Sequence, residues 1–167
     1  DELWETLTHE LQHHLESLAE EDALIAMDYA NDENFKRLDG EPFDPFFYRS
    51  GEEVAEGVWR VERDVFFEQR YPASREPGAE VEIVWLGEPY RLARLAELGD
   101  VCFVHIEEGL DTGAGGEVYL VLVRERGLGA SLRALFGGAS PTIVEAAARA
   151  EPVRAKGSAP GTDKDGA

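Results

Sequence analysis

The chain has 167 residues, which is enough for one domain with a substantial core. Its 35 acidic and 16 basic residues give a formal net charge of −19. Such an excess of carboxylates argues against binding to nucleic acid or to anionic membrane surfaces, because both need clustered Lys and Arg. A solubilising acidic surface, or contact with a basic partner, is compatible with this charge.

Cys102 is the only cysteine, so the chain cannot form an internal disulfide. No apolar run approaches the roughly 20 residues that span a bilayer, and no signal peptide is visible. We therefore expect a cytoplasmic protein. The sequence enters a helical pattern directly after Asp1, which leads us to expect a chain truncated at its amino terminus.

The first 38 residues are predicted to be helical. Up to about residue 30, apolar residues recur every three or four positions, with a break expected at 20–22 and a second helical stretch over 23–38. We expect the leucines to fix this helix in a core. They are Leu3, Leu7, Leu11, Leu15 and Leu18.

Residues 39–53 contain two prolines, two glycines and a group of aromatic residues, which predicts a loop. Phe43, Phe46, Phe47 and Tyr48 favour packing in this region. The alternative is that they line a pocket above a metal-binding cleft.

The middle of the chain changes to strand-like patterns. Alternating or apolar segments predict strands over 58–67, 80–85, 90–95, 100–106 and 117–123, with a hairpin loop at 109–116 joining the last two. Four or five such strands suggest a small antiparallel sheet or partial barrel.

Two short helices are expected near the carboxyl end, at about 129–136 and 141–150. Ser140 followed by Pro141 is typical of a helix start. The predicted fold class is α+β, with a motif helix, second helix and loop over 1–57. A β-rich region with the short helices spans 58–150, and a tail predicted to be disordered spans 151–167.

One motif indicates chemistry: His9-Glu10-Leu11-Gln12-His13 has the form H-E-x-x-H. Positions i and i+4 share one face of a helix, so two imidazoles can bind one zinc ion at about 2.0–2.1 Å. The Glu after the first His would reach the metal-bound water and act as general base. The histidines fall opposite the leucines and are expected to face a cleft.

The stretch from Leu7 to Leu15, with its doubled His13-His14, resembles the bacterial zincin-like (minimal zincin) metallopeptidases. The resemblance covers about residues 5–25. It implies that His9 and His13 are zinc ligands, that Glu10 is catalytic, and that Asp22 is the third metal ligand. The family has Gly three residues after the second motif His, where this chain has Glu16, and it has strands before the motif helix, where this chain has eight residues.

The third ligand is open on the residues alone, since Glu16, Glu20 or Asp28 could also serve. The leading hypothesis is a zinc-dependent peptidase acting on a peptide or protein substrate. The alternatives are a non-catalytic metal-binding protein and an acidic protein-interaction domain without metal. Cys102 is expected to be a small buried hydrophobe, and His105 a strand histidine satisfied by hydrogen bonds.

Overall fold

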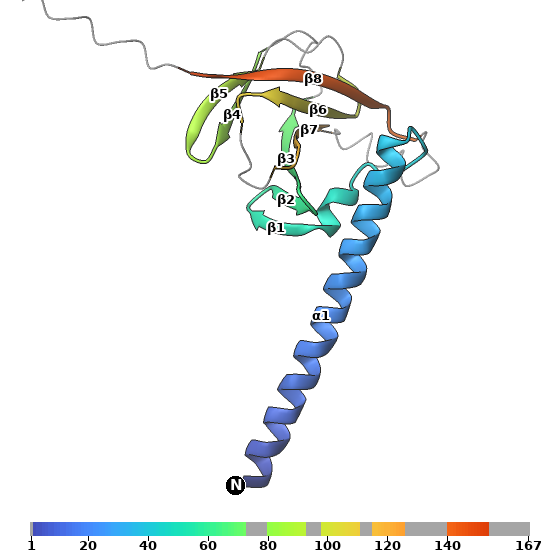
Figure 1. Cartoon of the computed structure of the whole chain (residues 1–167), viewed down its shortest axis with the longest axis vertical. Coiled ribbons are helices and arrows are strands. Elements are labelled where there is room, and N and C mark those ends of the chain that lie inside the picture. Colours follow the sequence, from blue (N-terminus) through green and yellow to red (C-terminus); the bar gives the residue numbers. More distant parts are fainter. Residues whose placement is uncertain (1, 73–79, 93–97, 111–114, 126–139, 154–167) are drawn as a thin grey trace, which may run out of the picture.

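The computed structural model describes residues 2–72, 80–92, 98–110, 115–125 and 140–153. One long helix, α1, is followed by a 3-10 turn, η1, and by strands that curl into a half-barrel (Figure 1). The bounds are α1 Glu2–Leu38, η1 Phe47–Ser50, β1 Glu52–Ala55, β2 Val58–Val61, β3 Asp64–Tyr71, β4 Val81–Trp85, β5 Glu88–Leu92, β6 Val101–Glu108, β7 Val118–Arg124 and β8 Ile143–Pro152.

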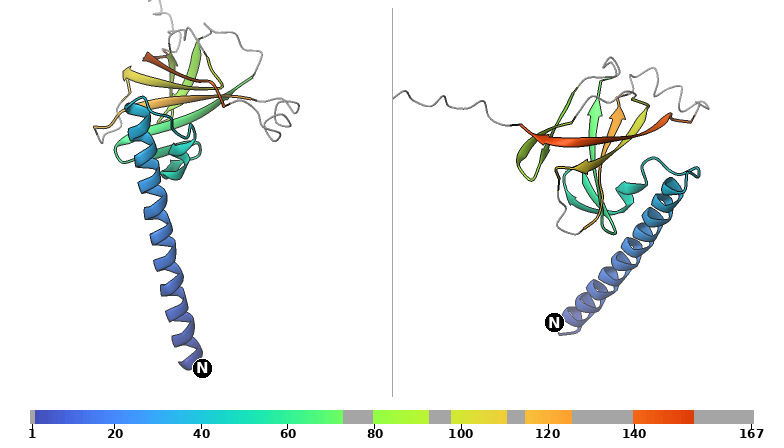
Figure 2. Two further views of the ribbon diagram at one scale, coloured as in Figure 1. Left: turned by 90° about the vertical axis from the view of Figure 1, so that its right-hand side faces the viewer. Right: turned by 45° about the horizontal axis from the view of Figure 1, so that its top comes forward.

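The strands form one mixed sheet in the order β1-β2-β3-β7-β6-β8-β5-β4. The β3–β7 and β6–β8 pairs are parallel, and the other neighbouring pairs are antiparallel. The predicted hairpin of β6 and β7 is confirmed, with Val101 opposite Val123. The curl of the sheet is clearest in the tilted view of Figure 2.

The central strands are buried on both faces, so each strand contributes alternate residues to two cores. Phe67, Cys102 and Leu120 belong to a first core enclosed by the curled strands. Their neighbours Phe66 and Phe103 belong to a second core, which lies beneath the end of α1 and η1. This double burial explains why β6 and β7 are almost continuously apolar.

The last two turns of α1 fix the helix to the sheet through Arg37, which is 5% exposed. Its guanidinium carbon lies 4.3 Å from the centre of the Tyr119 ring and 5.3 Å from that of Phe103. The same guanidinium donates to Asn34 Oδ1 and to Glu145 Oε1 on β8. A single cation therefore joins α1 to the second core and to the neighbouring strand β8.

A second set of contacts closes the loop after α1. Glu33 accepts hydrogen bonds from Lys36 and from the backbone N–H of Asp44, and these bonds lower the pKa of its carboxyl. The Tyr29 hydroxyl donates to Asp44, which raises the pKa of this phenol to about 12. The loop is thus held against the helix by groups from both.

The remainder of α1 leaves the sheet. Every side chain from residue 4 to residue 25 is exposed, and we call this segment the arm. Figures 1 and 2 show it extending away from the half-barrel in all three views. At 1.5 Å per residue the arm is about 32 Å long.

Three sequence predictions about the fold are wrong. No break occurs at residues 20–22, because α1 is continuous and Glu is well tolerated in a helix. The predicted α+β fold class with a small antiparallel sheet or partial barrel is wrong as well. Within the described residues, a single helix precedes eight strands, and these form one mixed, curled sheet with two parallel pairs.

The predicted helix at 141–150 is also wrong, because this segment forms β8. Its Ala-rich sequence favours a helix in isolation, but pairing with β6 and β5 overrides that preference. Ala146, Ala148 and Ala150 turn inward, whereas Glu145 and Arg149 are exposed. Residues 129–136 and 154–167 lie outside the described residues, and residues 151 and 152 of the predicted tail belong to β8.

Replacing Arg37 with Ala should lower the free energy of unfolding by about 2 kcal/mol, because the aromatic rings lose a desolvated cation. Urea unfolding followed by circular dichroism measures this change. Arg149→Ala is the matched control, since its ion pair with Glu108 is exposed on both sides and should contribute little. Equal stability of the two variants would contradict this role of Arg37.

Candidate functional site

Six large apolar side chains follow one side of the arm and belong to neither core. Their exposed fractions run from 45% at Leu18 to 70% at Trp4. The prediction of burial in a core is therefore wrong for Leu7, Leu11, Leu15 and Leu18, whereas the side chain of Leu3 lies outside the described residues. We call this set the apolar row; its members are Trp4, Leu7, Leu11, Leu15, Leu18 and Ile25.

The sheet cannot cover the apolar row because of the phase of α1. The side of the helix that meets the sheet is marked by Ala30, Asn34 and Arg37, all of which are buried. At about 100° per residue, the apolar row is turned roughly 110° away from that side. Contacts that fix the helix end thus leave the row free along the arm.

The charge around the row has one sign. Residues 2–35 contain ten Asp and Glu residues and no Lys or Arg. Glu10, Glu21 and Asp28 lie along one border of the row, roughly 90° from its centre, and Asp22 lies between Leu18 and Ile25. We call the first three the acidic edge. Within the described residues, no helix is apolar enough over a sufficient length to cross a membrane.

His9 and His13 come together on another side of the arm. Their Nε2 atoms are 3.0 Å apart, with ring planes at 84°. This separation is compatible with both nitrogens binding one zinc ion at the usual about 2.0–2.1 Å. Glu16 Oε2 lies 3.7 Å from His13 Nδ1, where a carboxylate can orient the imidazole.

The proposed third ligands do not converge on this pair. Asp22 is nine residues beyond His13, hence roughly 14 Å along the axis and on the opposite side of the helix. Glu20 and Asp28 are roughly 10 Å and 22 Å along it. Glu16 is therefore the nearest of the four carboxylates. Across the described parts of the chain, no group of three or more His, Cys, Asp or Glu could hold a metal ion.

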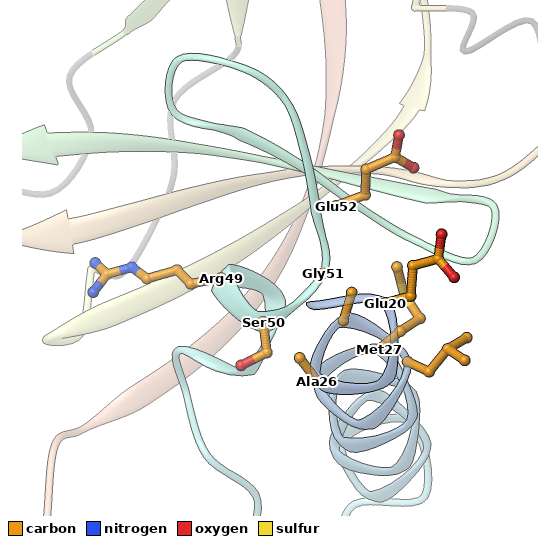
Figure 3. A pocket seen from close by; sticks show the side chains of 9 residues that line it. Glu20, Ala26, Met27, Arg49, Ser50, Gly51 and Glu52 are labelled. Carbon is orange, nitrogen blue, oxygen red and sulfur yellow. The ribbon is translucent and has the colours of Figure 1, made fainter. Parts of the chain in front are cut away.

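The motif residues do not face an enclosed cleft. Glu10 is exposed on the arm, and His14 is exposed as well. A cleft of about 720 Å³ does lie where α1 approaches η1 and β1, and Glu20 is at its edge (Figure 3). Its walls are mostly apolar or small, and Arg49 points away toward Glu68. The lining residues are Glu20, Ala23, Leu24, Ala26, Met27, Arg49, Ser50, Gly51 and Glu52.

The aromatic residues after α1 serve packing, as predicted. Phe47 and Tyr48 are fully buried and contact Phe66 and Phe103. Burial, and a hydrogen bond to Glu68, raise the pKa of the Tyr48 phenol far above its ordinary value.

His105 is hydrogen-bonded, as expected of a structural strand histidine. Its Nε2 lies 2.6 Å from Glu117 Oε2, and its ring packs beside Tyr119. This contact joins β6 to the residue before β7. It accounts for His105 without a ligand.

Sequence reasoning identified the four leucines of the apolar row but assigned them to a core, and it did not single out Ile25. The missing signal was the local charge: ten carboxylates without a single Lys or Arg mark residues 2–35 as a highly solvated segment. The cleft was not predicted, because Ala23, Ala26 and Gly51 carry no chemical pattern. No protein-family model, curated protein or solved structure matches this chain.

Cys102 should be inert in the folded protein. It is fully buried in the first core, and burial raises the pKa of its thiol to about 11. At pH 8 the native protein should react with a disulfide reagent far more slowly than the urea-unfolded chain, because both thiolate formation and access are blocked. Equal rates in the two states would contradict the burial of Cys102.

Proposed function

We propose that this chain is a protein-binding module in which the arm is the contact surface. The observation that carries the proposal is the apolar row: six large apolar side chains, 45–70% exposed, on a helix that projects from its own domain. Apolar residues at three- and four-residue spacing are the pattern with which one helix recognises another. The half-barrel then acts as the base that holds the arm.

The energetics of exposure support this function. Each half-exposed leucine stands to gain on the order of 1 kcal/mol when its remaining surface is covered. The row repeats this gain over about six helical turns, and a partner helix of similar length would contact all of it. We further propose a cytoplasmic location, which is supported by the lone, unpaired Cys102.

A synthetic amphipathic helix with a leucine face and glutamine elsewhere tests the proposal. The full chain should bind this peptide, and Leu11→Ala with Leu15→Ala should weaken binding at least about tenfold. Fluorescence anisotropy of the labelled peptide measures the affinity. Alanine preserves helix propensity, so the arm itself should remain helical.

The matched control is Leu24→Ala with Leu38→Ala. These leucines belong to the same helix and are 67% and 57% exposed, but they lie on other sides of it. This control should bind as the wild type does. Loss of binding in both double variants, or in neither, would refute the apolar row as the contact surface.

The second candidate function is a zinc-dependent peptidase related to the zincin-like metallopeptidases. The observation that favours it is the 3.0 Å separation of His9 Nε2 and His13 Nε2. Glu16 is the nearest carboxylate, and Glu10 would be the general base toward a peptide or protein substrate. A complete site would need further ligands, from water or from outside the described residues.

Elemental analysis of protein purified without chelator tests this candidate. The wild type should hold about one zinc per chain, and His13→Ala should lose it because one imidazole remains. His14→Ala is the control and should keep zinc, since this side chain is turned about 100° from His13. Glu10→Gln should keep zinc and lose peptide cleavage. Absence of zinc from the wild-type protein would refute the zinc-dependent peptidase function.

A further inference from the structure

The chemistry of the partner can be inferred from the charge around the apolar row, provided that the arm binds protein as proposed. Whatever covers the row must also accommodate Asp22 within it and the acidic edge beside it. Among the described residues, none of these four carboxylates has an ion-pair partner. Their charge is therefore uncompensated on the face where a partner would lie.

The two borders of the row differ. The acidic edge lies on one side, whereas the other side is bordered by the uncharged residues Thr8, Gln12 and Ala19, with the Glu16 carboxylate behind Gln12, from which it accepts a hydrogen bond. The acidic edge also lies roughly 160° round the helix from the side that meets the sheet. Basic residues of the half-barrel are thus not positioned to neutralise it, and that role falls to the partner.

A second copy of this chain fits the surface poorly. Pairing two arms would bury two apolar rows, but it would also bring one acidic segment against another. Because residues 2–35 have no Lys or Arg, neither a parallel nor an antiparallel pairing offers opposite charges. An anionic membrane surface is disfavoured for the same reason.

We propose that the partner is a cationic amphipathic helix of another protein. Its apolar face covers the row from Trp4 to Ile25, and its Lys or Arg side chains lie along one border, against the acidic edge. Opposite charges on a helix pair set its orientation and accelerate its association. The match requires about six turns of partner helix with basic residues on one side only.

Three peptides that share the leucine face but differ along one border test this inference on the full chain. That border carries lysine, glutamine or glutamate. The lysine peptide should bind about tenfold more tightly than the glutamine peptide at about 0.05 M salt, and this advantage should shrink at about 0.5 M. The glutamate peptide should bind most weakly.

Variants locate the source of the preference. Glu21→Gln with Asp28→Asn should remove most of the lysine advantage. Glu53→Gln with Glu56→Gln also removes two negative charges, but from the exposed β1–β2 hairpin. This variant controls for net charge and should leave the preference for the lysine peptide unchanged.

The outcomes separate this inference from the proposed function. Equal affinity for the lysine and glutamine peptides, both dependent on Leu11 and Leu15, would overturn the cationic partner and leave the protein-binding arm intact. Binding of neither peptide through those leucines would overturn both. Dimerisation in sedimentation experiments that is abolished by Leu11→Ala with Leu15→Ala would assign the row to a second copy and overturn the inference.

Discussion

The buried guanidinium of Arg37 is the interaction on which the arrangement of the molecule depends. It lies against the rings of Tyr119 and Phe103 and donates to Glu145 on β8, the strand that pairs with β6. A cation in this place would be costly if it were unpaired, and the rings and carboxylate together offset that cost. Since Arg37 is in the last turn of α1, the direction of the whole helix is set at one end.

The fold concentrates apolar contacts in the sheet and leaves the helix with almost none. The strands β3, β6 and β7 supply both cores, so the half-barrel has its own interior without the arm. The apolar row is then an apolar surface that folding does not use. Its position beside a continuous acidic segment is what connects the structure to a protein-binding role.

The sequence allowed accurate prediction wherever a pattern reports directly on burial. Val101 to Ile106 is apolar on both faces, and its strand was predicted correctly. Ser140-Pro141 and the alanines after it led to the wrong prediction of a helix at 141–150. Alanine occurs at both inward and outward positions of β8, so no alternation is visible in the sequence, and it favours a helix locally. A local sequence pattern does not indicate which distant strand a segment pairs with, so the parallel β6–β8 pair could not be predicted from the sequence.

Helical geometry determines which features of the site were predictable from the sequence and which were not. The i, i+4 spacing correctly brought His9 and His13 together, and helical periodicity correctly placed the leucines on one side. Periodicity shows that a helix has an apolar side, but it does not show what covers that side. Likewise, Asp22 was chosen by resemblance to a family that has Gly three residues after the second motif His, whereas α1 continues without a break through Glu16 and Asp22.

Because α1 is fixed to the sheet at Arg37 and would bind its partner along the arm, the helix also sets the angle between the partner and the half-barrel. Each residue inserted between Arg37 and the arm would rotate the apolar row by about 100° relative to the sheet and advance it by 1.5 Å. A partner bound to the row would therefore change its direction relative to the half-barrel with each inserted residue. Insertion of seven residues would nearly restore the original direction, but at a greater distance from the half-barrel. Because α1 is continuous through residues 20–30, the helix fixes both the distance and the direction from the half-barrel to the partner.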